Sequence, residues 1–96
     1  MSKQLQICFD YDGTYDADPQ LWVPIISMMK GRGHRVILAT MRDDIDGERL
    51  PEEVTRQFDR VYYTGRQAKL IYLQNLLGLK VDIWIEDRPD WLFNDG

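Results

Sequence analysis

The sequence has few residues that could form cross-links or sulfur-based metal sites. Its 96 residues include one cysteine, Cys8, and one histidine, His34. A single cysteine excludes an internal disulfide and a cysteine-based zinc site. Cys8 lies inside an apolar run, so we expect a small core side chain. His34 lies at the start of a later apolar run, where we expect a structural or solvated role.

Long apolar runs and an excess of basic charge are also missing. No segment is long and apolar enough for a signal peptide or a membrane span, which predicts a cytoplasmic protein without membrane contact. The formal net charge of −4 argues against electrostatic binding of nucleic acid over an extended surface, although a local arginine-lined groove is compatible with this charge. We expect a partner that is small or is bound through a metal.

What is present suits one globular domain over residues 1–96, without repeats or linkers. Predicted strands cover residues 5–9, 36–39, 60–63 and 81–85, and predicted helices cover residues 19–30, 48–57 and 66–77, with a short closing helix or turn at 88–93. This alternation implies right-handed crossovers. We predict an α/β fold, a three-layer α/β/α sandwich with a short, mostly parallel sheet of about four strands and at most a rudimentary fifth.

Two carboxylates follow the first predicted strand. Asp10 and Asp12 stand two residues apart before Gly13, which permits the backbone angles of a tight turn. They would lie at the carboxyl edge of the sheet, where ligands bind in open α/β folds. Two carboxylates repel by roughly 4 kcal/mol at ~4 Å and an effective dielectric near 20, so a divalent cation between them is favoured. A polar turn without a ligand is the alternative for this segment alone.

Other strand ends carry matching chemistry. Thr40 ends the second strand, Lys69 falls one turn into the predicted helix over residues 66–77, and Glu86 and Asp87 follow the fourth strand. The Lys69 side chain would lean back toward the carboxyl edge. Carboxylates, a hydroxyl and a lysine suit phosphoryl transfer, and hard oxygen ligands favour Mg²⁺.

These segments resemble the motifs of the haloacid dehalogenase-like (HAD) superfamily of phosphatases, which have a Rossmannoid fold. The matching stretches are F-D-Y-D-G-T at residues 9–14, V-I-L-A-T at 36–40, Lys69, and I-E-D at 85–87. The resemblance spans nearly the whole chain. It implies a HAD-like core domain over residues 1–96, and no interval between motifs is long enough for a cap domain.

The resemblance implies a Mg²⁺-dependent phosphomonoester hydrolase. Asp10 would be the nucleophile, forming an aspartyl-phosphate, and would also bind Mg²⁺. Asp12 would protonate the leaving group, activate water and bind the metal through its backbone carbonyl. Thr40 and Lys69 would hold the transferring phosphoryl group, and Asp87 would complete the metal site.

The remaining candidates follow from the same resemblance. Glu86 is a second candidate metal ligand, whereas Asp90 lies one residue short of the family's commoner spacing from Asp87. The residues assigned to substrate binding are Gly13, Met41 and Arg42. Arg42 resembles the arginine of the T-x-R segment in some nucleotide and polynucleotide phosphatases of the family, and a surface arginine is the alternative.

The substrate and the rival function remain open at this stage. Capless members tend to act on large substrates, so nucleotides and nucleic-acid ends are candidate substrates. Other members gain a lid by oligomerising, and Trp84, Trp91 and Phe93 could form a subunit contact. The alternative function is a non-catalytic phosphoacceptor or metal-binding regulatory module, like a receiver domain. Receivers carry the accepting Asp on a later strand, which favours the enzyme.

Overall fold

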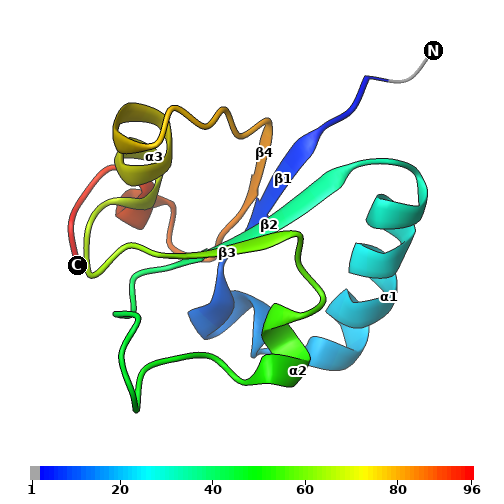
Figure 1. Cartoon of the computed structure of the whole chain (residues 1–96), viewed down its shortest axis with the longest axis horizontal. Helices are drawn as coiled ribbons and strands as arrows, with labels where there is room; N and C mark the ends of the chain where they lie inside the picture. Colours follow the sequence, from blue (N-terminus) through cyan, green and yellow to red (C-terminus); the bar gives the residue numbers. More distant parts are fainter. Residues whose placement is uncertain (1–2) are drawn as a thin grey trace.

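The computed structural model describes residues 3–96, which form a four-stranded, all-parallel sheet with helices on both faces (Figure 1). The strands are β1 (Gln6–Phe9), β2 (Arg35–Thr40), β3 (Arg60–Tyr63) and β4 (Ile83–Ile85), and their order in the sheet is β3-β2-β1-β4. The predicted α/β class and the expected number of strands are confirmed. No helix within residues 3–96 has the length and apolar character needed to cross a membrane.

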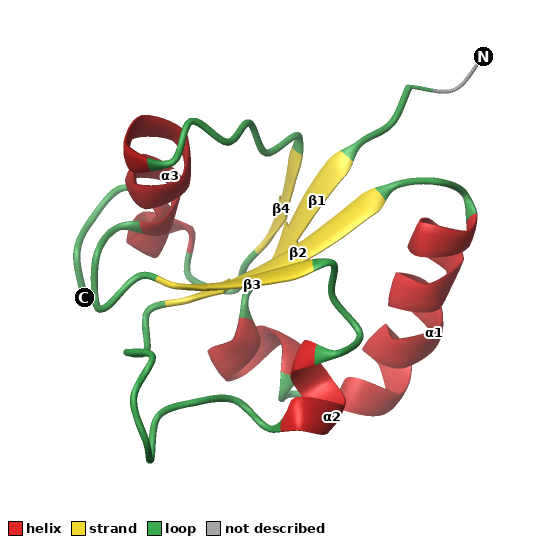
Figure 2. Ribbon diagram, in the orientation of Figure 1, coloured by secondary structure: helices red, strands yellow, loops and turns green. Residues whose placement is uncertain are grey.

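Side chains alternate along the strands and so divide the core into two layers. One cluster joins α1 (Pro19–Gly31) and α2 (Glu52–Thr55) to the strand residues Ile7, Phe9, Val36 and Leu38. The other joins Leu73, in the turn η2 (Tyr72–Leu76) that continues α3 (Lys69–Ile71), to the strand residues Cys8, Ile37 and Ala39. Figure 2 shows α1 and α2 on one side of the sheet and α3 on the other.

Helix α1 begins where the sequence predicts. The Asp18 carboxylate accepts a hydrogen bond from the backbone N–H of Leu21 at 3.3 Å, and Pro19 is the first helical residue. Past the end of the helix, His34 Nδ1 accepts the backbone N–H of Leu5 at 3.0 Å. This hydrogen bond confirms a structural role for His34.

The second predicted helix is shorter than expected, because α2 covers only Glu52–Thr55. Pro51 precedes it with an extended backbone (φ −59°, ψ 145°). Leu50 is buried and donates its N–H to the Tyr63 hydroxyl at 3.2 Å. A residue before proline avoids helical angles, so the helix does not extend back over residues 48–50, and Leu50 packs toward β3 instead.

The third predicted helix begins three residues late, at Lys69. Arg66 has a left-handed backbone (φ 71°), and the Asp95 carboxylate accepts the N–H of Ala68 at 2.7 Å. Lys69 is therefore the first residue of α3, and the expected position one turn inside the helix is wrong. Strand β4 is also shorter than predicted, since the carboxylate of Asp82 accepts the N–H of Gln6 at 2.8 Å before the ladder begins.

We expect Phe9→Ala to lower the free energy of unfolding by about 3–5 kcal/mol, because it opens a cavity in the first cluster. Phe9 is fully buried, with its ring 5.2 Å from that of Trp22 and 5.8 Å from that of Phe58. Phe93→Ala is the matched control, since Phe93 is 59% exposed, and it should change stability by less than about 0.5 kcal/mol. Urea unfolding measures both, and equal losses would contradict the assigned core.

Candidate functional site

Asp10 is the first residue after β1 and is buried, with 4% of its surface exposed. Its backbone N–H donates to the carbonyl of Ile85 in β4 at 2.9 Å. This bond extends the ladder between β1 and β4 by one residue. The Asp10 carboxylate is therefore held at the carboxyl end of the sheet, beside the residues that follow β4.

The Lys69 ammonium lies between two carboxylates. Its Nζ donates to Oδ1 of Asp10 and, at 2.6 Å, to Oε1 of Glu86. The Lys69 side chain is 1% exposed. A buried polar group must be hydrogen-bonded, and the two carboxylates fix the Lys69 side chain in place.

Thr14 connects Asp10 to Asp87 on the other side. Its hydroxyl oxygen lies 3.2 Å from Oδ2 of Asp10 and 3.1 Å from Oδ1 of Asp87, and it accepts the backbone N–H of Asp87 at 3.1 Å. Thr14 had no predicted role. Tyr15 donates its N–H to the Asp10 carbonyl at 3.2 Å, and this turn brings Thr14 back over Asp10.

Gly13 allows Asp87 to come close. Its φ is +84°, and a Cβ at this position would overlap the Asp87 carboxylate. Its N–H donates to Oδ1 of Asp16 at 2.7 Å. Both the turn and the approach of Asp87 therefore require glycine here.

We call Asp10, Thr14, Lys69, Glu86 and Asp87 the carboxylate–lysine cluster. Its three carboxylates offer oxygens that lie within 4.8 Å of one another, and its single ammonium leaves a formal charge of −2. Burial raises the pKa of Asp10 to about 8, although Lys69 opposes this shift. The pKa of Asp87 is lowered overall. Burial acts to raise this pKa, but the hydrogen bonds with Asp10 and Thr14 act in the opposite direction and outweigh burial.

The carboxylate–lysine cluster fits a hard divalent cation. Mg²⁺ holds oxygen ligands at ~2.0–2.1 Å, so opposite ligands are ~4 Å apart, close to the spread seen here. Lys69 occupies one oxygen of Asp10 and one of Glu86, whereas Asp87 is exposed and opens the cluster to solvent. Asp90 lies outside, because its carboxylate pairs with Arg88 at 3.1 Å. Asp10 and Asp87 are thus the best-placed ligands.

Asp12 and Thr40 make their hydrogen bonds outside the carboxylate–lysine cluster. The Asp12 carboxylate accepts Nε of Arg42 at 3.0 Å and Nη2 at 2.7 Å. The Thr40 hydroxyl accepts the backbone N–H of Arg42 at 3.3 Å, and within residues 3–96 no hydrogen bond links it to Asp10 or Lys69. The structure therefore brings Asp10, Lys69 and Asp87 into contact and places Asp12 with Arg42.

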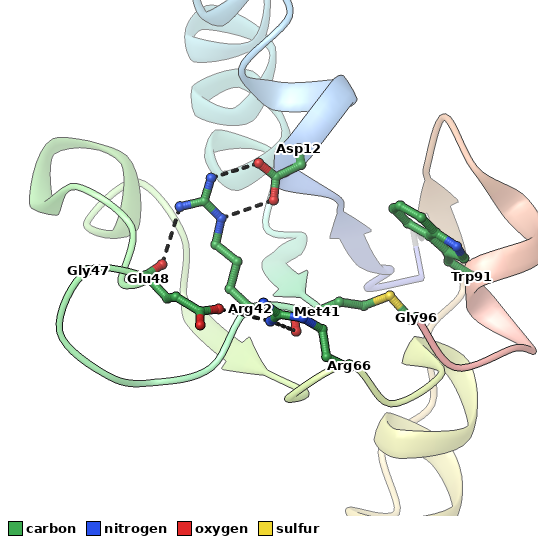
Figure 3. A pocket seen from close by; sticks show the side chains of 8 residues that line it. All are labelled: Asp12, Met41, Arg42, Gly47, Glu48, Arg66, Trp91 and Gly96. Atoms are coloured by element: carbon green, nitrogen blue, oxygen red, sulfur yellow. Dashed lines mark hydrogen bonds and ion pairs between the residues drawn. The ribbon is translucent and has the colours of Figure 1, made fainter.

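A cavity of about 550 Å³ opens beside Asp12 (Figure 3). It is lined by Asp12, Met41, Arg42, Gly47, Glu48, Arg66, Trp91 and Gly96, and we call it the Arg42 pocket. The paired side chains of Asp12 and Arg42 lie across the pocket from Trp91 in Figure 3. Met41 and Arg42 were predicted to bind substrate. Glu48 and Arg66 were missed because they come from loops without a recognisable motif, and Trp91, in the short 3-10 helix Pro89–Leu92, was expected only as a candidate subunit contact.

Comparisons of the chain with protein-family models, with curated proteins and with solved structures found no match. Support for a function therefore comes from the geometry of the carboxylate–lysine cluster and of the Arg42 pocket, together with the sequence motifs.

We expect the metal-free protein to lose stability as the pH rises from about 4 to 8. Burial raises the pKa of Asp10 above its ordinary value of 3.8, so the folded protein holds this proton more tightly than the unfolded chain in that range. Asp10→Asn removes the titrating group. In EDTA, the melting temperature of this variant minus that of the wild type should therefore increase as the pH rises. Asp46→Asn, at a fully exposed side chain, should follow the wild type. A difference between Asp10→Asn and wild type that is independent of pH would contradict the assignment.

Proposed function

We propose that this protein is a Mg²⁺-dependent phosphomonoester hydrolase that acts through an aspartyl-phosphate on Asp10. The observation that carries the proposal is the buried Asp10 carboxylate at the end of β1, in contact with Lys69 and with the Thr14–Asp87 pair. The resemblance of the motifs to the HAD superfamily supports the same chemistry. A HAD-like assignment of the four-stranded fold is part of this proposal.

In the proposed first step, an oxygen of Asp10 attacks the substrate phosphorus. A bond forms between this oxygen and phosphorus while the bond from phosphorus to the leaving oxygen breaks, and Asp12 donates a proton to that oxygen. Lys69 lies against Asp10, so its ammonium is placed to offset the negative charge of the phosphoryl oxygens.

In the proposed second step, Asp12 takes a proton from water, and the water oxygen attacks the phosphorus of the phosphorylated Asp10. The bond between Asp10 and phosphorus breaks, which releases inorganic phosphate, restores the Asp10 carboxylate and leaves Asp12 in the protonated form that donates in the first step. Thr40 is a candidate donor to the phosphoryl group, because its hydroxyl hydrogen is not used when the oxygen accepts the N–H of Arg42.

Asp10 and Asp87 would hold the cation, with Glu86 beside them. When bound, Mg²⁺ supplies positive charge that neutralises the carboxylates and the phosphoryl oxygens. The formal charge of −2 on the carboxylate–lysine cluster gives a physical reason for a divalent ion rather than a monovalent one. The substrate is a phosphomonoester, and nucleotides and nucleic-acid ends are the first to test.

Phosphate release from p-nitrophenyl phosphate and a panel of phosphomonoesters should require Mg²⁺. Asp10→Asn should reduce turnover to background, because the amide is not a nucleophile, whereas Asp46→Asn should retain it. Turnover that survives Asp10→Asn would exclude the proposed nucleophile. Release of one phosphate per protein without further turnover would favour the phosphoacceptor alternative.

Mg²⁺ should raise the melting temperature of the wild type in the absence of substrate. At ten times its Kd, a ligand of the folded state adds about 1.4 kcal/mol, which for a chain of this size is several degrees. Asp87→Asn should abolish the shift, and Asp90→Asn should preserve it, because Asp90 pairs with Arg88 away from Asp10. An equal Mg²⁺ response in the two variants would contradict the ligand assignment.

A further inference from the structure

The Arg42 guanidinium holds both oxygens of the Asp12 carboxylate. Its Nη2 donates to Oδ1 at 2.7 Å and its Nε to Oδ2 at 3.0 Å, from a residue thirty positions further along the chain. Two parallel hydrogen bonds fix the plane of a carboxylate as well as its position. Asp12 makes no other side-chain hydrogen bond within residues 3–96, so Arg42 alone determines where its carboxylate points.

Arg42 is itself fixed by contacts from separate segments. Its backbone N–H donates to the Thr40 hydroxyl at 3.3 Å, and its Nη1 donates to the carbonyl of Glu48 at 3.3 Å. The guanidinium carbon lies 5.2 Å from the centre of the Tyr11 ring, within cation–π range. Arg42, just after β2, thereby determines the orientation of the Asp12 side chain, which follows β1.

Asp12 needs such a support. Its backbone is not helical (φ −69°, ψ 121°), it precedes Gly13, and its side chain is 47% exposed. Without a partner, the Asp12 carboxylate would sample several rotamers. Proton transfer requires a carboxylate that is held in one position beside the reacting oxygen.

We infer that Arg42 is the positioning residue for Asp12, and that it orients the carboxylate toward the leaving group rather than binding substrate itself. The inference rests on the proposed function, which gives Asp12 the proton-transfer role. Asp12 and Arg42 both line the Arg42 pocket, where the leaving group has room. Among the described residues, three of the five guanidinium N–H groups of Arg42 donate to Asp12 or Glu48, whereas Arg66, in the same pocket, uses only the two on Nη1 and has the larger share free for a substrate.

The test compares two substrates of similar size, p-nitrophenyl phosphate and p-nitrobenzyl phosphate. The phenolate leaves readily without a proton, whereas the alkoxide needs one. Arg42→Ala and Arg42→Gln should lower kcat/KM, which reports the first step, about 10²-fold for the benzyl ester and less than about threefold for the phenyl ester. Arg42→Lys, which keeps one hydrogen bond, should recover part of the loss. In an Asp12→Ala background, Arg42→Ala should have no further effect.

Arg49→Ala is the matched control, because this exposed arginine pairs with Asp44 at 2.6 Å outside the pocket. Circular dichroism confirms that each variant is folded. Equal losses of kcat/KM on both esters would make Arg42 a substrate contact and overturn the inference, as would additive effects with Asp12→Ala. Absence of Mg²⁺-dependent turnover in the wild type would overturn the proposed function itself, and the inference with it.

Discussion

An excess of negative charge in a largely buried position is the constraint on which the site depends. Asp10 is only 4% exposed, and Lys69 offsets the charge of only one of the three carboxylates around it. The Thr14 hydroxyl and the turn at Gly13 then bring Asp87 to the same place. Repulsion among these carboxylates lowers the stability of the fold, and under the proposed function a bound cation would relieve it.

The convergence of Asp10 with Asp87 could be predicted because it follows from topology. Carboxyl ends of parallel strands share one edge, which the predicted sheet implied, and the structure adds that β1 and β4 are neighbours, with Phe9 opposite Ile85. The residues after each strand must therefore meet. Lys69 could be placed there as well, since a helix that follows a strand begins at this edge. Its exact position in α3 was wrong, because the left-handed Arg66 depends on contacts outside its own segment.

The contacts of Asp12 could not be predicted in the same way. Its partner Arg42 is remote in the sequence, and no period or spacing connects an exposed carboxylate to one particular guanidinium. The role of Thr14 was missed for a related reason. The sequence D-G-T does not show whether the threonine hydroxyl caps its own turn or connects two carboxylates, as Thr14 connects Asp10 and Asp87. Side-chain pairs across loops depend on loop geometry, which hydrophobic periodicity does not encode.

Within residues 3–96, strand β4 has three residues, lies at an edge of the sheet and pairs only with β1. Detaching it would carry Glu86 and Asp87 away from Asp10 while β3, β2 and β1 remained paired. Local opening of this kind costs less free energy than global unfolding and is sensed by amide hydrogen exchange. An ion bound by both Asp10 and Asp87 would hold β4 against β1. Amide hydrogen exchange at residues 83–85 would then slow when the site is occupied, which would report occupancy without an enzymatic assay.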